Sequence, residues 1–101
     1  MTTITVEELK SRIDAHEKLN IVDVREPFEY EEFNIGAKLI PLGKIQVMET
    51  EEIDHLKNEE VILHCKAGGR SMQAAMILEQ MGFTNVVNLT GGMIAWRQKF
   101  F

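Results

Sequence analysis

Residues 61–71 read VILHCKAGGRS, and this stretch decides the fold. Its first four residues are mostly branched and apolar and too few for a helix, so they predict a buried strand that ends at His64. A helix is predicted from about Arg70 to Met81, because apolar residues recur there at helical spacing from Ala74 onward. Gly82 follows, where the end of a helix favours a left-handed residue. A buried strand that leads directly into a helix is the building unit of α/β proteins.

The same alternation of strand and helix patterns extends toward both termini. Thr5 and Glu8 have the spacing of a capping box, which predicts a helix that begins after Thr5. Pro27 suits the first position of a second helix, which we expect to end near Glu32. The remaining patterns predict strands at 21–24, 39–40 and 85–89, a broken helix around 45–56, and a last helix that begins at 93–96.

These patterns indicate one α/β domain over residues 1–101. Strands that are apolar on both faces are typical of a mostly parallel sheet, and we expect four to five strands with helices on both faces. Ligands of such sheets bind at the carboxyl ends of the strands. The segment after His64 is therefore the first candidate for a functional site.

The composition narrows the classes of function. Hydrophobic residues make up 45% and charged residues 27%, which is ordinary for a folded domain. The net charge of −5 argues against nucleic acid as a partner, because phosphate binding requires a concentrated basic surface. No apolar run is long enough to span a membrane and no secretory signal is visible, so we expect no membrane partner and a cytoplasmic location. One cysteine excludes an internal disulfide and a cysteine-rich metal site.

The segment from Cys65 to Ser71, which we call the Cys65 loop, has the features of an anion cradle. Gly68 and Gly69 can take positive φ, so successive amides can converge on one point. The helix that opens at Arg70 adds unpaired N–H groups and the positive end of its dipole. Lys66 and Arg70 would place two cations around this cradle. A thiol in such a setting is favoured as a thiolate or anionic persulfide, with a pKa of roughly 3.5–7.5 instead of about 8.5.

A lone cysteine also has a second interpretation, because free cysteines are often inert core residues. The place of Cys65 at the end of a strand, before a Gly-Gly-Arg helix start, favours the reactive interpretation. His64 precedes Cys65, but strand alternation directs the two side chains to opposite faces, so we predict no direct catalytic role for His64. Three methionines at helical spacing are expected to fill the core: Met72, Met76 and Met81.

Three blocks of the chain resemble, in order and spacing, the signatures of the rhodanese family. The first is DVREP at 23–27 followed by Glu29-Tyr30, and the second is GAKLIPL at 36–42. The third is the Cys65 loop with 82–83, 88–92 and Trp96. One departure is visible, because the family commonly reads His-Ile-Pro-Gly-Ala before the second block, whereas this chain reads Asn34-Ile35-Gly36-Ala37 without the histidine.

The resemblance implies a single-domain rhodanese-like sulfurtransferase with no cofactor and no metal. Cys65 would accept sulfane sulfur from thiosulfate, a polysulfide or a protein persulfide, and pass it to a thiol or to cyanide. The implied partners are a small sulfur-donor anion, a thiol acceptor and a sulfur-relay protein. Arg70 would hold the loop or the incoming anion, while Asp23 and Arg25 would brace the site. The implied cradle consists of Lys66, Ala67, Gly68, Gly69, Arg70 and Ser71.

Two alternatives to sulfur transfer use the same fold. Related phosphatases and arsenate reductases have one residue more in this loop, whereas only four residues separate Cys65 from Arg70 here. The second alternative is a non-catalytic module whose loop binds an anion or a partner. The Phe100-Phe101 terminus fits either packing on the sheet or contact with another subunit.

Overall fold

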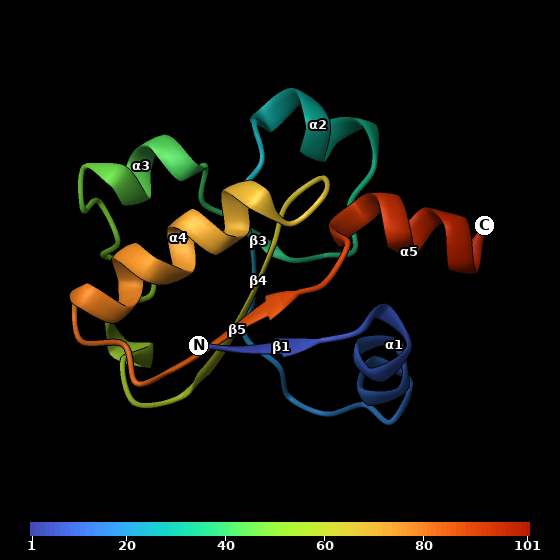
Figure 1. Cartoon of the computed structure of the whole chain (residues 1–101), viewed down its shortest axis with the longest axis horizontal. Helices are drawn as coiled ribbons and strands as arrows, with labels where there is room; N and C mark the ends of the chain where they lie inside the picture. The colour runs from blue at the N-terminus through green and yellow to red at the C-terminus, as the bar shows by residue number, and fades with distance from the viewer.

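The computed structural model describes residues 1–101 as a five-stranded parallel sheet flanked by helices (Figure 1). The strands are β1 (Thr2–Ile4), β2 (Ile21–Asp23), β3 (Lys38–Leu39), β4 (Glu60–His64) and β5 (Asn85–Leu89), in the spatial order β1-β5-β4-β2-β3. Every neighbouring pair is parallel. The helices are α1 (Val6–Asp14), α2 (Pro27–Glu32), α3 (Leu42–Gln46), α4 (Gly69–Gln80) and α5 (Gly92–Phe100), with a 3₁₀ turn η1 (Asp54–Leu56). The predicted α/β class with a mostly parallel sheet is confirmed.

Alternation along β4 shows how the sheet is covered on both faces. Val61 and Leu63 point into one apolar cluster, which also contains the inner residues of α3 and α4. Ile62 points the other way, into a cluster with residues of α1 and α5 such as Leu9 and Trp96. In Figure 1 the helices α1 and α5 lie together on one side, away from α3 and α4. None of the helices combines the length and the apolar composition that a membrane-spanning segment requires.

Local signals set the helix starts where the sequence predicts them. The Thr5 side chain accepts a hydrogen bond from the Glu8 amide and the Glu8 side chain accepts one from the Thr5 amide, so the capping box is confirmed. Pro27 begins α2, where its missing N–H costs no helical hydrogen bond. Gly82 has a φ of +100° directly after α4, as predicted.

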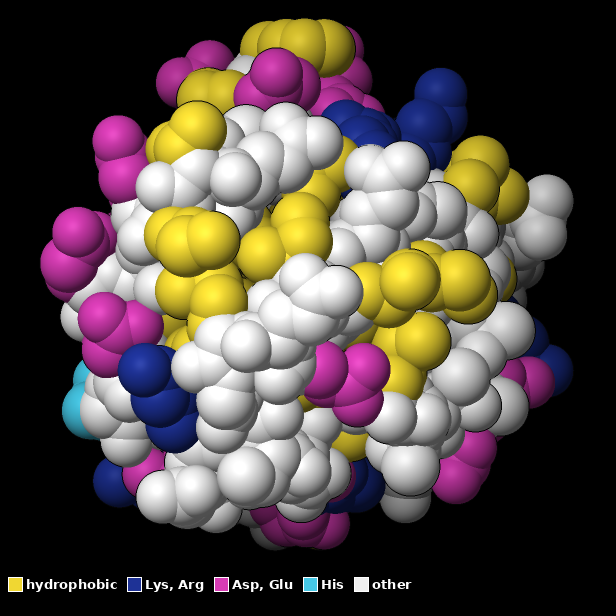
Figure 2. Space-filling view, turned by 60° about the vertical axis from the view of Figure 1, so that its left-hand side comes forward, with side chains coloured by type: hydrophobic (Ala, Val, Ile, Leu, Met, Phe, Trp, Pro, Cys, Tyr) yellow, Lys and Arg dark blue, Asp and Glu magenta, His cyan; other side chains and the backbone are white.

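Two expectations need correction. Strand β1 was not predicted, because three residues are too short to show a period; its place at the edge follows from parallel pairing with β5. Met72 and Met76 were expected in the core, but they are 45% and 55% exposed on α4, and only Met81 packs against the core. Figure 2 shows several apolar groups on the face that carries α3 and α4.

Residues 34–37, which depart from the family pattern, form a turn that is stabilised by side-chain hydrogen bonds. Asn34 Oδ1 accepts a hydrogen bond from the Gly36 amide at 2.9 Å, and Gly36 has a φ of +83°. The Tyr30 hydroxyl donates to the carbonyl of Ala37 at 2.7 Å. At the chain's end, Phe100 packs edge-on against Trp96, whereas Phe101 contacts the Phe33 ring but stays 82% exposed.

Candidate active site

Cys65 stands at the carboxyl edge of the sheet, where the parallel strands direct their ends to one side. It follows β4 directly, is only 1% exposed, and lies in the cluster that faces α3 and α4. Gly68 has a φ of +114° and turns the chain into α4. Of the two glycines expected at positive φ, only Gly68 adopts it, because Gly69 is already the first residue of the helix.

The Cys65 loop directs hydrogen-bond donors at its sulfur. The Gly68 amide donates to Sγ at 3.1 Å, and the Ser71 hydroxyl lies 3.4 Å from the same atom. Burial raises the pKa of the Cys65 thiol, while hydrogen bonds from the Ser71 side chain and from the amides of Ser71, Gly68 and Ala67 lower it. The lowering prevails, so the pKa of Cys65 lies below that of an ordinary thiol and the thiolate is favoured.

Asn88 on β5 belongs to this site, although the sequence reasoning did not select it. Its Oδ1 accepts a hydrogen bond from the Ser71 hydroxyl at 2.5 Å, and both side chains are buried. Its amide nitrogen lies 3.4 Å from the carbonyl of Gly68. A hydroxyl carries one proton, so at any moment Ser71 can donate to only one of Asn88, the sulfur and the Gly68 carbonyl, which lies 3.1 Å from the hydroxyl oxygen. A polar residue inside the apolar strand 85–89 was the signal that could have found it.

The start of α5 holds the carbonyl side of the Cys65 loop. The Met93 amide donates to the Cys65 carbonyl at 3.0 Å, and the Ile94 amide donates to the Lys66 carbonyl at 2.9 Å. Gly92 lies so close to the loop that a Cβ there would be 2.5 Å from the Cys65 oxygen. Because α5 holds these carbonyls, the amides of the loop remain free to face the sulfur.

Arg70 does not stand free beside the sulfur as a second unpaired cation. Its Nη1 and Nη2 donate to the two carboxylate oxygens of Glu29 on α2, at 2.7 and 2.9 Å. The hydrogen bond from Arg70 is the main reason that the pKa of Glu29 falls to about 2. Lys66 is exposed and makes no ion pair. The sequence indicated the arginine but not its partner, which lies 41 residues away.

Asp23 and Arg25 form a buried ion pair next to the end of β4. The guanidinium donates through Nε and Nη2 to the Asp23 carboxylate, at 3.0 to 3.1 Å and 2.8 Å, and through Nη2 to the Phe33 carbonyl. His64 pairs with Asp23 in the register of the sheet, and its Nε2 is 3.8 Å from the Asp23 carboxylate. Neither ring nitrogen of His64 has a hydrogen-bond partner. Burial lowers the pKa of His64 to about 4, so the ring is neutral.

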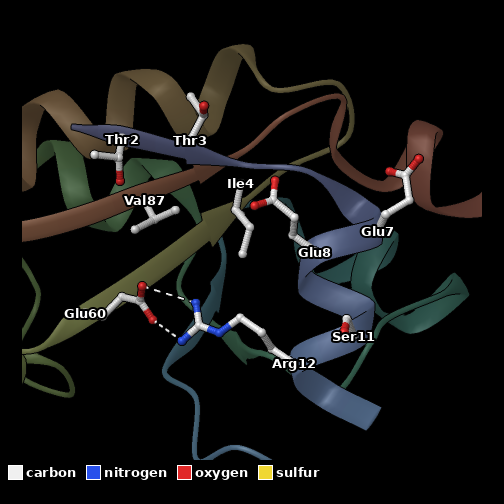
Figure 3. A pocket seen from close by; sticks show the side chains of 9 residues that line it. All are labelled: Thr2, Thr3, Ile4, Glu7, Glu8, Ser11, Arg12, Glu60 and Val87. Atoms are coloured by element: carbon white, nitrogen blue, oxygen red, sulfur yellow. Dashed lines mark hydrogen bonds and ion pairs between the residues drawn. The ribbon is translucent and has the colours of Figure 1, made fainter. Parts of the chain in front are cut away.

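The largest cavity lies away from this site. It has a volume of about 600 Å³ between β1 and α1, and no residue of the Cys65 loop lines it (Figure 3). Arg12 and Glu60 in the wall of this cavity neutralise each other, because the Arg12 guanidinium donates to both carboxylate oxygens of Glu60. No three His, Cys, Asp or Glu side chains lie close enough together to bind a metal ion.

Comparison with known proteins relates this geometry to a family. The model of the rhodanese-like domain matches residues 5–99. A protein from Bacillus subtilis, named "Putative sulfur carrier protein YrkF", is 39% identical over 97 residues, which are 95% of this chain and 51% of that protein. A sulfurtransferase from Allochromatium vinosum is 36% identical over 94 residues, or 92% of this chain and 85% of that one. The chain thus spans about half the length of YrkF and most of the second relative.

A solved structure agrees with these sequence matches. The crystal structure of a rhodanese-like domain protein from Staphylococcus aureus superposes with a TM-score of 0.83 at 36% identity. The superposition covers 95% of this chain and 91% of that one.

Proposed function

The chain belongs to the rhodanese-like domain family, and from this membership and the geometry of the Cys65 loop we propose that it is a sulfurtransferase that carries sulfane sulfur as a persulfide on Cys65. Support comes from relatives that are named sulfurtransferases. The observation that carries the proposal is the pair of donors on one buried sulfur, the Gly68 amide and the Ser71 hydroxyl. Donors that converge on a sulfur stabilise the negative charge that it bears as a thiolate.

The reaction would proceed in two displacements. The Cys65 thiolate attacks the sulfane sulfur of a donor such as thiosulfate, the donor's S–S bond breaks, and sulfite leaves with the electron pair. The persulfide anion that remains keeps its charge on the outer sulfur. An acceptor thiolate, or cyanide, then attacks the outer sulfur, and Cys65 leaves as the thiolate. Two separate half-reactions predict ping-pong kinetics, and neither needs a general base when both sulfurs react as anions.

The protein's contribution would be mostly electrostatic. The Cys65 and Lys66 carbonyls accept hydrogen bonds from the Met93 and Ile94 amides of α5. The loop leads directly into the N-terminus of α4, where the helix dipole is positive, and the Gly68 amide donates to the Cys65 sulfur. Asp23 and Arg25 would brace this edge of the sheet through their buried ion pair. Arg70 would hold the loop in place through Glu29.

The acceptor is proposed to be a separate molecule. Cys65 is the single cysteine, so no second thiol of this chain can remove the outer sulfur. One relative is named as a sulfur carrier, which supports a sulfur-relay protein as one exchange partner, beside small donors such as thiosulfate and polysulfides. The four-residue spacing between Cys65 and Arg70 weighs against a phosphatase or arsenate reductase, whose loops are a residue longer.

Intact mass spectrometry tests the proposal directly. The protein is incubated with thiosulfate or a polysulfide, desalted and weighed, beside Cys65→Ser. We expect wild type alone to gain the mass of one sulfur atom, and to lose it again on addition of cyanide or dithiothreitol. Absence of any gain on a thiol that still reacts with an alkylating agent would refute the persulfide mechanism and favour the anion-binding module.

A further inference from the structure

Asn88 is a buried polar residue that faces the Cys65 loop from the neighbouring strand of the sheet. It is 3% exposed, and it pairs with Leu63 in the register of β5 with β4. Alternation along β5 puts its side chain on the same face as Val86, which lies in the apolar cluster that contains Cys65. A buried amide in apolar surroundings is costly unless it is hydrogen-bonded, so its partners indicate what it does.

The two partners of the Asn88 side chain fix which way its amide points. The amide nitrogen lies 3.4 Å from the Gly68 carbonyl oxygen, and the amide oxygen lies 2.5 Å from the Ser71 hydroxyl. A carbonyl can only accept, so the NH₂ group must face Gly68 and the amide oxygen must face Ser71. The amide oxygen carries no proton, and Ser71 is therefore the donor in its hydrogen bond with Asn88.

The proton of the Ser71 hydroxyl has three acceptors within reach. They are the Asn88 oxygen at 2.5 Å, the Gly68 carbonyl at 3.1 Å and the Cys65 sulfur at 3.4 Å. The contact with Asn88 is the shortest, so the proton stays with the amide while the sulfur is uncharged. A thiolate accepts a stronger hydrogen bond than a neutral sulfur does, so the ionised Cys65 competes with Asn88 for this proton.

The ionised groups near the sulfur take no part in this competition. Around the Cys65 loop they form two groups that pair internally, beside one exposed lysine: Asp23 with Arg25 and His64, Glu29 with Arg70, and Lys66. Arg70 interacts with the Cys65 thiolate through its charge. None of these groups hydrogen-bonds to Ser71 or Asn88, so a substitution at Asn88 leaves their contacts intact.

We propose that Asn88 is a positioning residue that competes with the Cys65 sulfur for the Ser71 proton and so limits how far the thiolate is stabilised. Its effect on sulfur transfer rests on the proposed function of Cys65. When an acceptor attacks the outer sulfur, the S–S bond breaks and Cys65 takes the electron pair. The Ser71 hydroxyl then turns from Asn88 to the sulfur, with its O–H bond intact. Once new sulfur is loaded, the charge lies on the outer atom and the hydroxyl turns back.

This competition balances two demands on one sulfur. Cys65 is the nucleophile of the first displacement and the leaving group of the second. A hydrogen bond that lowers the pKa of a thiol makes it leave more readily, but it slows attack by the thiolate about threefold per unit of pKa. Because Asn88 holds the Ser71 proton while the sulfur does not need it, the sulfur stays nucleophilic for the first step.

The pH dependence of alkylation tests the competition on the unloaded protein. The rate at which Cys65 reacts with iodoacetamide is measured against pH in Asn88→Leu, which removes the acceptor with little change in shape. We expect the midpoint to fall by about 0.5 pH unit or more, because the Ser71 hydroxyl then donates to the thiolate. Asn85→Leu makes the same change at the exposed start of β5 and should keep the wild-type midpoint. An unchanged or higher midpoint in Asn88→Leu would overturn the inference.

A purely structural role for Asn88 predicts a shift of the opposite sign. A loop released from Asn88 would misorient the Gly68 amide, which donates to the sulfur at 3.1 Å, and the midpoint would rise. In a Ser71→Ala background, Asn88→Leu should no longer lower the midpoint, since no hydroxyl remains to be shared. An equal fall in that background would also overturn the inference. If Asn88→Leu does not fold, Asn88→Ala replaces it with the same expected sign.

The two half-reactions separate this inference from the persulfide chemistry. The rate of sulfur loading from thiosulfate, per concentration of thiolate, and the rate of unloading to cyanide are measured separately in wild type and Asn88→Leu. We expect loading to slow and unloading to accelerate, because a thiol of lower pKa attacks more slowly and leaves more readily. Parallel changes in both rates would contradict the role of Asn88. A protein that never loads sulfur would refute the proposed function, while its alkylation midpoints would still decide the role of Asn88.

Discussion

Glu29 and Arg70 form a two-point ion pair that connects α2 to the first turn of α4 beside the Cys65 loop. A cation in the first turn of a helix opposes the helix dipole, and here a carboxylate compensates it. The guanidinium is therefore held in one orientation next to the sulfur. Glu29 also lines a cavity between α2 and α5, together with Lys66 and Arg97.

Acid should weaken the fold through Glu29. The folded-state pKa of about 2 lies below the ordinary value of 4.5, so the carboxylate stabilises the fold above pH 4.5 and this contribution is lost as the pH falls toward 2. Urea unfolding of Glu29→Gln should show a smaller loss of stability over this window than wild type. Glu31→Gln, an exposed neighbour on α2, is the control and should follow wild type. Identical acid profiles for Glu29→Gln and wild type would contradict the role of the pair.

His64 should give a separate pH dependence at milder acidity. Burial lowers its pKa to about 4 in the folded protein, against 6.5 for a free side chain. Between these two values the unfolded chain binds more protons, so stability rises with pH across this window. Its neighbours Asp23 and Arg25 oppose each other in their effect on this pKa. In His64→Gln the slope of unfolding free energy against pH should decrease there, whereas the exposed His55→Gln should retain it. A wild-type profile that is flat from pH 4 to 6.5 would exclude this assignment.

A methyl group at Gly92 should damage both stability and the site. The residue has a φ of +55°, and a Cβ would be 2.5 and 2.7 Å from the carbonyl oxygens of Cys65 and Lys66. We expect Gly92→Ala to lower the unfolding free energy by about 1–3 kcal/mol or more and to slow persulfide formation. Gly43→Ala is the matched control, because Gly43 lies in α3 with no atom within 4 Å of the added group. That change should stabilise by about 0.5–1 kcal/mol. Equal behaviour of the two variants would show that the close approach at Gly92 is not required.

Removal of the Ser71 hydroxyl should raise the pKa of the Cys65 thiol. Burial already acts in that direction, and the Ser71 side chain is the largest of the hydrogen-bond donors that oppose it. The rate of alkylation by iodoacetamide, measured against pH, should therefore have a higher midpoint in Ser71→Ala. Ser11→Ala makes the same change on the exposed surface of α1 and should keep the wild-type midpoint. An unchanged or lower midpoint in Ser71→Ala would mean that the Ser71 hydroxyl donates to Asn88 or to the Gly68 carbonyl and not to the sulfur.

The elements that the sequence predicted well are those with local causes. The capping box at Thr5, the proline at the start of α2 and the left-handed Gly82 depend on neighbours within a few residues. The position of the Cys65 loop was predicted for the same reason, because the strand before it, its glycines and the helix after it are consecutive in the sequence. The prediction that Met72 and Met76 of α4 lie in the core was wrong. Helical spacing shows which residues share a face of the helix, but it does not show which face the rest of the protein covers.

The parts of the candidate site that escaped prediction come from distant segments. Glu29 reaches Arg70 across 41 residues, and Asn88 reaches Ser71 across 17. The contact of Gly92 with the Cys65 carbonyl depends on the order of β4 and β5 in the sheet, which no periodic pattern encodes. A sequence shows which residues can bind an anion, whereas only the packed chain shows which of them are already occupied by each other.

The dependence of the Cys65 loop on the start of α5 has a consequence for the protein during its synthesis. Cys65 is translated before Gly92, Met93 and Ile94, and it therefore emerges from the ribosome before they do. Until they emerge, the Cys65 and Lys66 carbonyls lack the amides that hold them, and the donors around the sulfur are not yet oriented. We therefore expect the reactivity proposed for Cys65 to develop only as the last helix docks.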